Sequence, residues 1–439
     1  MSGKKIQAAL LGLGTVGGGT YKILKRQREE MEAKLGAVVE VKKVLVRNLE
    51  KAAGKVEDPS VLTDNWQEIL EDPQIQIVIE LMGKIEPART YILEALRAGK
   101  HVVTANKDLL AEHGKELLDT AKEKGCDLLF EAAVGGGIPI IRPLKQCLAG
   151  NRIQEIMGIV NGTTNYILTK MTQEGMEFEE ALAEATRLGY AESDPTADVE
   201  GLDAGRKMAI LASIAFNSRV TFADVVTEGI TGITAKDIQY AGELGCVIKL
   251  LGMAKNTESG IEVGVHPMLI PRAHPLASVN DSYNAIFVVG DAVQDAMFFG
   301  RGAGEMPTAS AVAGDVFDVV RNLLHGCCGR ISCTCYKELP IKRPAEARHK
   351  YFLRMKVEDR CGVLAGITQV FAGNQVGISQ MIQKQVRKEG EAELVFVTDE
   401  VEEQYFQDAL TVLRSMSMVH KISAVIQVYD CLLYTSRCV

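Results

Sequence analysis

Gly12-Leu13-Gly14-Thr15-Val16-Gly17 is the stretch that decides the fold of the first part of this chain. It follows an apolar run at residues 6–11 and precedes a segment of helical composition at residues 20–34. In a Gly-x-Gly-x-x-Gly turn, the first glycine permits the tight bend, the second lets the backbone approach a pyrophosphate, and the third allows close helix packing. The stretch predicts a strand, a dinucleotide-binding turn and a helix; a glycine turn with a purely structural role is the alternative.

Apolar runs and helix-like segments then alternate as far as residue 143. The runs cover residues 38–46, 75–81, 101–104 and 127–133, and the helix-like segments include residues 87–98 and 108–124. This alternation is typical of a parallel sheet with helices on both faces. We expect an α/β fold with an N-terminal Rossmann-type domain at residues 1–143, completed by a returning helix near residues 310–325 that Ser310 caps.

The end of the second strand indicates which nicotinamide cofactor binds. NAD-selective sites place an acidic residue there to hydrogen-bond the ribose hydroxyl, but this strand ends in Arg47 and Asn48. A guanidinium pairs well with the 2′-phosphate of NADP, and Lys51 or Lys55 would add positive charge. We therefore expect NADP(H) to be preferred, with NAD(H) possible; an ordinary solvated arginine is the alternative.

Composition excludes several classes of protein. The chain has 439 residues, a net charge of -8 and 47% hydrophobic residues, and no run approaches the roughly 20 apolar residues of a membrane span. An acidic chain gives no reason to expect nucleic acid as a partner. Ten cysteines in a chain of this length favour reduced thiols and a cytoplasmic location. The clustered cysteines lack the C-x2-C spacing of zinc sites, which favours packing over metal binding; they are Cys327, Cys328, Cys333 and Cys335.

A second, α+β domain is expected at residues 144–309, and it carries the candidate chemistry. Within a helical segment at residues 202–216, Asp203 and Lys207 lie one turn apart and share a face. That face continues into apolar residues, so the pair points inward, where a lysine needs a partner and suits proton transfer. A structural ion pair explains the spacing equally well. Upstream, a loop punctuated by glycine and proline gathers carboxylates that would recognise an ammonium group: Glu192, Asp194, Asp198 and Glu200.

The C-terminal part of the chain has its own pattern. A charged, proline-bearing linker at residues 342–349 precedes a compact unit at residues 350–430. The unit runs strand, helix, strand, strand, helix, strand at residues 351–357, 363–372, 378–385, 392–398, 402–415 and 421–428. This order predicts a βαββαβ domain. Residues 431–439 have no evident structural role, and we expect a non-native tail there, produced by read-through or left by expression cloning.

Several motifs together resemble homoserine dehydrogenase, over most of residues 1–335. They are TANK at 104–107, EAAVGGGIP at 131–139, NGTTN at 161–165, the whole of residues 189–207, and GRGAG at 300–304. The resemblance implies reversible, NADP(H)-dependent oxidation of L-homoserine to L-aspartate 4-semialdehyde, a step in threonine, methionine and isoleucine biosynthesis. It also implies a catalytic domain that assembles a homodimer or homotetramer.

The resemblance further implies roles for individual residues. Lys207 would donate a proton to the aldehyde oxygen in the reductive direction, Asp203 would hold it, and Lys107 would lie near nicotinamide and substrate. The substrate-binding residues would be Glu192, Asp198, Asp203 and Thr163. The cofactor-binding residues would be Gly12, Leu13, Gly14, Thr15, Val16, Gly17, Arg47, Lys107, Gly189, Gly302 and Gly304. A structural sodium ion would take oxygen ligands from Glu131, Val134, Gly136 and Ile138.

Two positions depart from the pattern of that family. Lys84 follows Gly83 where a second glycine is usual, which puts the details of cofactor approach there in doubt. Glu305 stands where another glycine is expected, so Gly302 and Gly304 are the safer cofactor contacts.

Residues 359–365 (DRCGVLA) and 374–379 (NQVGIS) resemble an ACT domain, a fold that commonly binds amino acids between paired copies. Cys361 replaces the proline that is usual at that turn. The resemblance implies L-threonine as a feedback effector; a role in dimerisation alone is the alternative.

Two other functions remain open. In one, the dinucleotide domain is catalytically silent and the chain only senses an amino acid, which the intact Lys107, Asp203 and Lys207 speak against. The other is that of aspartate-semialdehyde dehydrogenase, which needs an activated cysteine nucleophile. Cys126 and Cys147 are the nearest cysteines, but neither lies in a recognisable nucleophile turn.

Overall fold

The computed structural model describes residues 4–385 and 390–429, and the chain divides into two compact units. Unit 1 comprises Met1–Ile156, Arg206–Val225 and Asn284–Leu339, and unit 2 comprises Met157–Gly205, Val226–Tyr283 and Pro340–Val439. The tail expected at residues 431–439 lies outside the described residues. Within the part of the chain that the structure describes, every helix is too short or too polar to cross a membrane.

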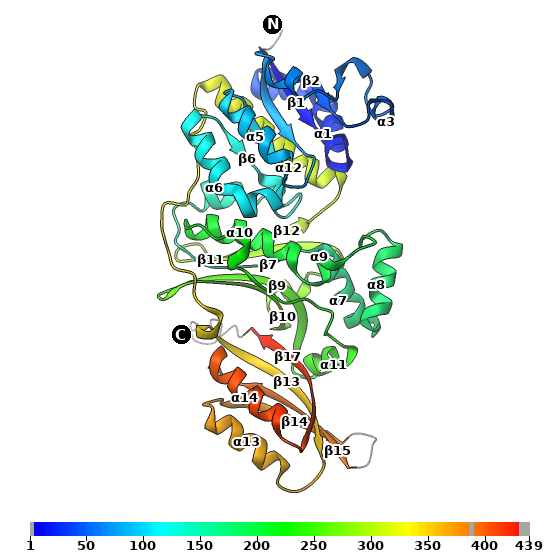
Figure 1. Ribbon diagram of the computed structural model, residues 1–439, viewed down its shortest axis with the longest axis vertical. Helices are drawn as coiled ribbons and strands as arrows, with labels where there is room; N and C mark the ends of the chain where they lie inside the picture. The colour runs from blue at the N-terminus through cyan, green and yellow to red at the C-terminus, as the bar shows by residue number, and fades with distance from the viewer. Residues whose placement is uncertain (1–3, 386–389, 430–439) are drawn as a thin grey trace. The chain divides into compact units, whose positions relative to one another are not determined.

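A six-stranded parallel sheet forms the centre of unit 1, which confirms the predicted α/β fold (Figure 1). Its strand order is β3-β2-β1-β4-β5-β6, and all of its pairings are parallel. The order reverses between β1 and β4, and ligands of doubly wound sheets bind at the carboxyl ends of the strands at such a point. The strands are β1 (Lys4–Leu11), β2 (Ala37–Leu45), β3 (Leu62–Thr63), β4 (Ile75–Glu80), β5 (His101–Thr104) and β6 (Leu128–Leu129).

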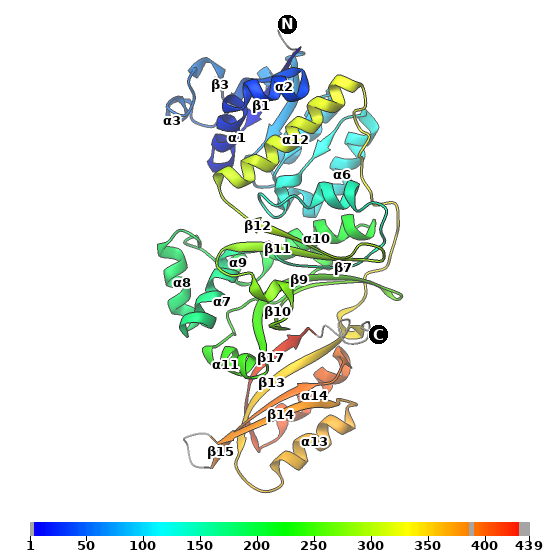
Figure 2. The same ribbon diagram turned by 180° about the vertical axis from the view of Figure 1, so that it is seen from behind.

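Helices cover both faces of this sheet (Figure 1, Figure 2). On one face α1 (Thr15–Arg26) packs along α12 (Glu305–His325), and on the other α5 (Ala88–Arg97) packs against α6 (Lys107–Lys124). The buried stripe of α12, formed by Val312, Val316, Val319 and Val320, has the spacing of one helix face and joins the same core as β1. The remaining elements of unit 1 include α2 (Arg28–Leu35), α3 (Leu49–Ala53), α4 (Gln67–Leu70), most of β11 (Tyr283–Gly290), and β12 (Gln294–Arg301).

Two expected elements of the N-terminal domain are wrong in detail. Residues 20–34 do not form one helix, because Gln27 leaves helical geometry at ψ 15°. Gln27 is both the C-cap of α1 and the N-cap of α2. The strand expected at residues 127–133 pairs only within β6. Beyond it the Glu131 N–H donates to Asp315 Oδ2 at 2.7 Å instead of to a neighbouring strand, and a 3-10 turn follows.

The start of the returning helix also differs from the expectation. α12 begins at Glu305 and not near Ser310, so Ser310 does not cap it. Gly304, with φ 118°, turns the chain into the helix. Pro307 lies in the first turn, where a backbone N–H has no helical partner to lose.

Unit 2 combines short helices with a long antiparallel hairpin. The hairpin consists of β9 (Cys246–Thr257) and β10 (Gly260–Pro271), and β8 (Val226–Thr227) pairs with β10. The helices are α7 (Gly162–Glu174), α8 (Phe178–Arg187), α9 (Thr196–Val199) and α11 (Ala235–Glu243). The boundaries between the units fall inside β7 (Ile153–Ile159) and α10 (Leu202–Phe216).

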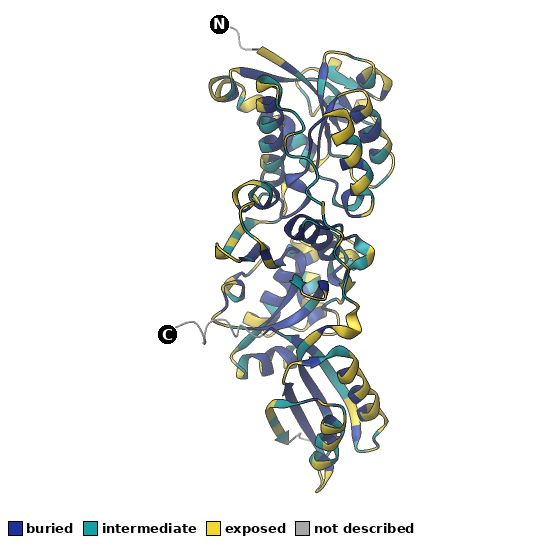
Figure 3. Cartoon of the chain, turned by 90° about the vertical axis from the view of Figure 1, so that its left-hand side faces the viewer, coloured by how far each residue is buried: buried dark blue, intermediate teal, exposed yellow. Residues whose placement is uncertain are grey.

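The C-terminal subdomain of unit 2, residues 348–428, has the predicted βαββαβ order with one added short strand. Its sheet runs β17-β13-β15-β14 with antiparallel pairings, and β17 also pairs with β10 in parallel. The two helices share one core with the sheet, and the strands β13 and β15 are largely buried whereas α13 and α14 expose their outer faces (Figure 3). The elements are β13 (Arg348–Glu358), α13 (Val363–Gly373), β14 (Ile378–Gln385), β15 (Glu391–Thr398), β16 (Val401–Glu402), α14 (Glu403–Ser415) and β17 (Val419–Val428).

Candidate functional site

The glycine-rich turn lies between β1 and α1, where the strand order reverses. Gly12 has φ 94°, and a side chain there would meet Leu81 O at 2.9 Å. A side chain at Gly17 would meet Gly12 O at 2.1 Å, so both positions require glycine. At Gly14 no atom lies within 4 Å of where a Cβ would be, which leaves open space at the start of α1. The turn therefore meets the demands of a pyrophosphate beside a helix N-terminus.

A cleft of about 510 Å³ opens from this turn across the carboxyl ends of β2 and β4. Arg47, Lys51 and Lys55 all line it, together with Asp64. Asn48 accepts a hydrogen bond from the Lys51 N–H at 2.8 Å and starts α3, while Lys55 Nζ donates to Leu13 O at 3.2 Å. The cleft thus places three positive charges at the end of the second strand. These charges are complementary to a dinucleotide that carries an additional phosphate group.

Glu80 organises the other side of the switch point, and we did not foresee it from the sequence. Burial raises the pKa of this carboxyl, which accepts hydrogen bonds from the Met82 N–H at 2.8 Å and from Thr104 Oγ1 at 2.6 Å. Thr104 Oγ1 in turn accepts from the Asn106 N–H at 3.0 Å. Glu80 thereby ties the end of β4 to the segment that leads into Lys107. An acidic residue closing the apolar run IQIVIE was the available signal.

The departure at Lys84 has a structural consequence. Lys84 adopts φ 60°, a left-handed conformation that explains why glycine is expected at this position. Its carbonyl accepts a hydrogen bond from Asn106 Nδ2 at 2.6 Å, and Asn106 Oδ1 accepts from the Leu109 N–H at 3.1 Å. Asn106 therefore caps α6 and holds the Lys84 turn against it.

The two candidate acid-base lysines of unit 1 occupy α6 and α10. Lys107 is the first residue of α6, and Lys207 lies on α10 with 9% of its surface exposed. The neighbouring residues connect the two helices, because Arg206 Nε lies 3.0 Å from Asp108 Oδ1. The structure thus places Arg206 of α10 beside Asp108 of α6 and leaves the neighbouring Lys207 almost fully desolvated.

In unit 2, Asn161 gathers two of the predicted substrate-binding carboxylates. Its Nδ2 donates to Asp198 Oδ1 at 2.7 Å and to Asp203 Oδ2 at 2.9 Å. Asp203 is buried and Asp198 is half-buried. Asn161 also caps α7, since its Oδ1 accepts from the Thr164 N–H at 2.9 Å. In the sequence Asn161 belongs to the NGTTN motif, and an asparagine immediately before a helix is typical of a cap.

The other predicted residues of unit 2 lie on one loop. Thr163 Oγ1 donates to Tyr190 O at 2.7 Å, which fixes the loop that begins at Gly189 with φ 79°. Glu192 follows in the same loop and is exposed. Thr163 therefore has a structural partner, whereas Glu192 presents its carboxylate to solvent.

The predicted cation ligands form a glycine turn in unit 1. Glu131 Oε1 accepts from the Ile140 and Ile141 N–H groups at 2.5 and 2.8 Å, and its Oε2 accepts from the Arg142 N–H at 2.8 Å. A carboxylate offers about four lone-pair positions, so three backbone donors leave room for about one further ligand. Gly135 and Gly136 have φ 72° and 56°. One carboxylate oxygen and the carbonyls of such a turn are hard oxygen donors, which fit a sodium-type ion.

Packing accounts for two of the remaining glycines. A side chain at Gly136 would meet Gly302 O at 2.3 Å, and a side chain at Gly302 would overlap the amide of Asn284 at 2.1 Å. Glu305, where a glycine was expected, begins α12 and pairs with Lys22 at 2.7 Å. Gly302 thus has a structural reason to be glycine that is independent of a cofactor.

The two cysteines considered for the aspartate-semialdehyde alternative lie in different surroundings. Cys126 is buried, and burial raises its pKa to about 11, so it carries almost no thiolate at neutral pH. Cys147 is exposed at the end of a π-helical turn, Pro143–Cys147. Burial thus argues against Cys126 as the nucleophile of thioester formation.

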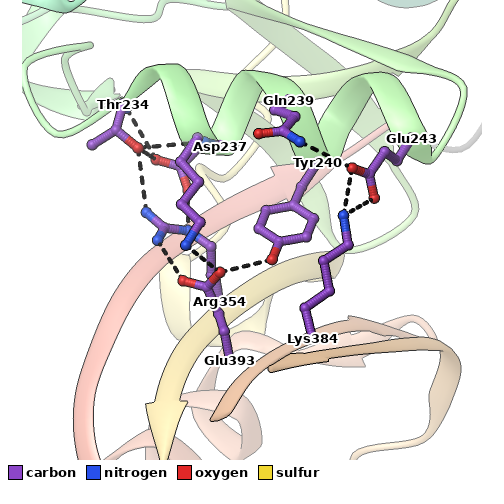
Figure 4. Close-up of polar contacts among 9 residues, drawn as sticks. Thr234, Asp237, Gln239, Tyr240, Glu243, Arg354, Lys384 and Glu393 are labelled. Carbon is purple, nitrogen blue, oxygen red and sulfur yellow. Dashed lines mark hydrogen bonds and ion pairs between the residues drawn. The ribbon is translucent and has the colours of Figure 1, made fainter. Parts of the chain in front are cut away.

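A buried ionic contact joins the C-terminal subdomain to α11 (Figure 4). Arg354 of β13 bonds Asp237 of α11 at 2.7 Å and Glu393 of β15 at 3.1 Å. Glu393 also accepts from Tyr240 at 2.7 Å and pairs with Lys236 at 2.6 Å. Burial opposes ionisation of Glu393, yet these donors hold its pKa below the usual range. We call these five residues the Arg354 network.

Family models match almost all of the first two thirds of the chain. The model described as "Homoserine dehydrogenase, NAD binding domain" matches residues 12–131, and the model described as "Homoserine dehydrogenase" matches residues 139–317. The glycine-rich turn lies in the first match, and Asn161, Asp203 and Lys207 lie in the second.

Complete proteins are similar over nearly the whole chain. A homoserine dehydrogenase from Bacillus subtilis is 45% identical over 426 residues, covering 97% of this chain and 98% of its own length. The crystal structure of a homoserine dehydrogenase from Thiobacillus denitrificans is 42% identical with a TM-score of 0.93, covering 98% of this chain and 100% of that one. A hyperthermophilic archaeal homoserine dehydrogenase mutant, solved in complex with NADPH, is 26% identical with a TM-score of 0.62 and covers 72% of this chain and 97% of its own.

Proposed function

The chain belongs to the homoserine dehydrogenase family and is an oxidoreductase acting on a CH–OH group, and we propose that it works as an NADP(H)-preferring enzyme of threonine, methionine and isoleucine biosynthesis. Members of this family act on homoserine and aspartate semialdehyde. The observation that carries the proposal is the nearly buried Lys207 one turn from Asp203, whose carboxylate Asn161 holds. A desolvated lysine beside a fixed carboxylate suits transfer of one proton.

The proposed reaction transfers a hydride and a proton to different acceptors. A nicotinamide cofactor held at the glycine-rich turn would supply a hydride acceptor for the hydroxyl-bearing carbon of L-homoserine. Lys207 takes the hydroxyl proton in that direction and returns it in the other. Asp203 orients Lys207, and Lys107 adds positive charge beside the oxygen on which negative charge develops.

Substrate recognition is assigned to the carboxylates of unit 2. Glu192 would bind the ammonium group, since it is exposed on the loop that Thr163 fixes. Asp198 would support the same end of the substrate because Asn161 ties it to Asp203. Gly189 would approach the cofactor through its backbone.

The preference for NADP(H) rests on charge at the cleft. Arg47, Lys51 and Lys55 line it, and Arg47 is exposed and therefore available to a 2′-phosphate. The archaeal relative that was solved with NADPH supports the same choice. NAD(H) remains a slower alternative because the glycine turn serves both cofactors.

We also propose a structural sodium ion at the Glu131 turn. Glu131 would supply one oxygen, and the carbonyls of Val134, Gly136 and Ile138 the others. The three backbone donors to Glu131 fix its carboxylate at the head of the turn.

Regulation is assigned to the C-terminal subdomain, which we propose is an ACT domain that binds L-threonine. Its βαββαβ order and single-sided helices support that assignment. The Arg354 network gives a route for coupling, because α11 packs on α7, the helix that Asn161 caps. A homodimer or homotetramer would provide the paired copies that such domains use.

The test is absorbance in the reduced-nicotinamide band with purified protein, L-homoserine, and either NADP or NAD. The proposal expects homoserine-dependent reduction that is faster with NADP and slower with added L-threonine. Absence of reduction with both cofactors would leave only an amino-acid sensor.

Arg47→Ala tests the cofactor preference separately. Loss of a charge-assisted bond, worth about 1.5–3 kcal/mol, should lower kcat/KM for NADP by about ten- to a hundredfold and leave that for NAD unchanged. Arg26→Ala, an exposed arginine outside the cleft, is the matched control. Equal losses with both cofactors would rule out recognition of the 2′-phosphate by Arg47.

A further inference from the structure

The cysteine cluster at residues 327–335 separates into two pairs with different surroundings. Cys327 Sγ lies 3.5 Å from Asn322 Oδ1, and burial raises the pKa of Cys328, which lies near Asp127. Cys333 and Cys335 have different neighbours, which include Arg219 and Ser213. No role in hydride transfer or cofactor binding has been assigned to either pair.

Cys333 and Cys335 line a small cavity of unit 1, and two basic side chains line it with them. Arg219 Nη2 donates to Cys333 Sγ at 3.3 Å, and the cavity, about 30 Å³, is also lined by Lys145. Cys335 lies two residues along the chain from Cys333, and its Sγ donates to Ser213 O at 3.6 Å. Both cysteines are half-buried, so solvent reaches the site. A volume of this size holds a molecule as small as water or hydrogen peroxide.

The surroundings of the pair shift the pKa values of its two thiols in opposite directions. A hydrogen bond from Cys335, together with the charges of Arg219 and Lys145, holds the pKa of Cys333 below its usual range. The hydrogen bond to Cys333 and burial raise the pKa of Cys335. These three groups are the titratable and charged neighbours that line the cavity. One thiolate beside one protonated thiol is the arrangement of a reactive cysteine with a resolving partner.

We propose that Cys333 is a peroxide-reactive thiolate and that Cys335 resolves its oxidised form into a reversible intrachain disulfide. The donor from Arg219, the adjacent thiol and the water-sized cavity together form the site. The oxidant is a small peroxide, and a cellular dithiol reductant restores the pair.

The reaction balances in two steps. Cys333 sulfur attacks one peroxide oxygen; the S–O bond forms, the O–O bond breaks, and the departing oxygen takes up a proton and leaves as water. Sulfur has then lost two electrons and is a sulfenic acid. Cys335 sulfur next attacks Cys333 sulfur; the S–S bond forms, the S–O bond breaks, and the hydroxyl leaves as water with the Cys335 proton.

The experiment exposes the full, reduced chain to hydrogen peroxide at pH 6 and at pH 9. Remaining thiols are blocked under denaturing conditions, and the peptides are analysed by mass spectrometry. Cys333 should lose its thiol at least about tenfold faster than the exposed Cys361 at pH 6, with a smaller difference at pH 9. The product should be a Cys333–Cys335 disulfide that dithiothreitol reverses. Equal rates at pH 6, or no such disulfide, would overturn the proposal.

Two variants distinguish the roles of the two cysteines and of the cation. In Cys335→Ser, dimedone should trap the sulfenic acid on Cys333, because its resolving partner is absent. In Arg219→Met, the pH at which Cys333 reacts at half its maximal rate should rise, whereas Arg187→Met, an exposed arginine of unit 2, should leave it unchanged. An unchanged midpoint in Arg219→Met would refute the assigned thiolate environment.

Discussion

Arg206 Nε lies 3.0 Å from Asp108 Oδ1, so an ion pair joins the residue before Lys207 to the residue after Lys107. The guanidinium also stacks over Phe222 at 4.7 Å. Asp108 is 39% exposed, so the pair adds little to stability. Its consequence is positional, because it holds Arg206 of α10 beside the first turn of α6.

Arg206→Met should therefore affect catalysis more than folding. We expect kcat to fall by about tenfold, since a small misplacement of catalytic groups is costly, while the free energy of unfolding changes by about 1 kcal/mol or less. Steady-state kinetics with L-homoserine and urea unfolding of the same preparation measure the two effects. Lys115→Met breaks the exposed Lys115–Asp119 pair on α6, the helix that also carries Asp108, and should change neither kcat nor the free energy of unfolding. A normal kcat in Arg206→Met would contradict the positional role, and Arg206→Lys should restore part of the loss.

Lys207→Ala should remove most turnover and leave cofactor binding nearly intact. Loss of a positioned acid-base group typically costs about 10²–10⁴ in rate. The measurements are kcat and the Kd for NADPH from fluorescence titration. Lys122→Ala, at an exposed position on α6, serves as the control. A Lys207→Ala variant with ordinary kcat would sink the catalytic assignment.

Arg354→Ala should strongly destabilise unit 2. Removing the guanidinium leaves Asp237 and Glu393 buried without their partner, and breaking a buried pair in this way costs about 3–5 kcal/mol. Lys384→Ala breaks the half-exposed pair with Glu243 and a cation–π contact with Tyr240 at 4.8 Å, and should cost only about 1–2 kcal/mol. Urea unfolding followed by fluorescence compares them. Similar midpoints for the two variants would show that the Arg354 network does not hold the subdomain to α11.

Acid should weaken the fold through His349. Burial lowers its pKa to about 4, and neighbouring cations add to the effect. Below pH 6.5 the unfolded chain takes up this proton before the folded chain does, so stability is fully present above pH 6.5 and is lost as pH falls toward 4. The loss between pH 7 and pH 5 is at most about 2 kcal/mol. The charged and titratable groups around the ring are His266, Lys255, Lys342, Glu262, Glu403 and Tyr351.

His349→Gln should make the urea midpoint of the chain less dependent on pH between 7 and 5. His420→Gln replaces a histidine whose side chain is 37% exposed and should leave that dependence unchanged. If wild type and His349→Gln lost stability in parallel, the depressed pKa of His349 would be wrong.

The sequence predicts those parts of the fold in which local pattern and tertiary structure agree. The glycine turn, the helix at residues 202–216 and the six C-terminal elements all follow from periodicity and turn residues. The position of Arg47, Lys51 and Lys55 could likewise be predicted, because they directly follow the second strand and the sheet fixes where that strand ends.

Other elements depend on contacts that no short segment contains. β9 is buried along both faces and lacks the alternation of a half-exposed strand, so its pattern did not identify it. β12 alternates, but between exposed and half-buried positions, which gives a weak signal. α11 was missed although Thr234 and Asp237 form a capping box at its start.

The candidate site shows the same division. Lys207 and Asp203 could be named from their spacing on one helix. Asn161 could not be given its role, because its two carboxylate partners lie far along the chain. The Arg206–Asp108 pair likewise joins helices that the sequence separates widely, and spacing says nothing about such a contact.

The position of α12 in the chain bears on how this protein is made. The helix supplies part of the core that β1 needs, yet the ribosome adds it long after β6. At about 5–20 residues per second, translation must continue for on the order of 10 s or more before the first-made strands can be covered. During that interval the nascent sheet exposes the part of one apolar face that α1 leaves for α12, which makes it a binding target for chaperones and sets a minimum length below which a truncated transcript yields no folded dinucleotide domain.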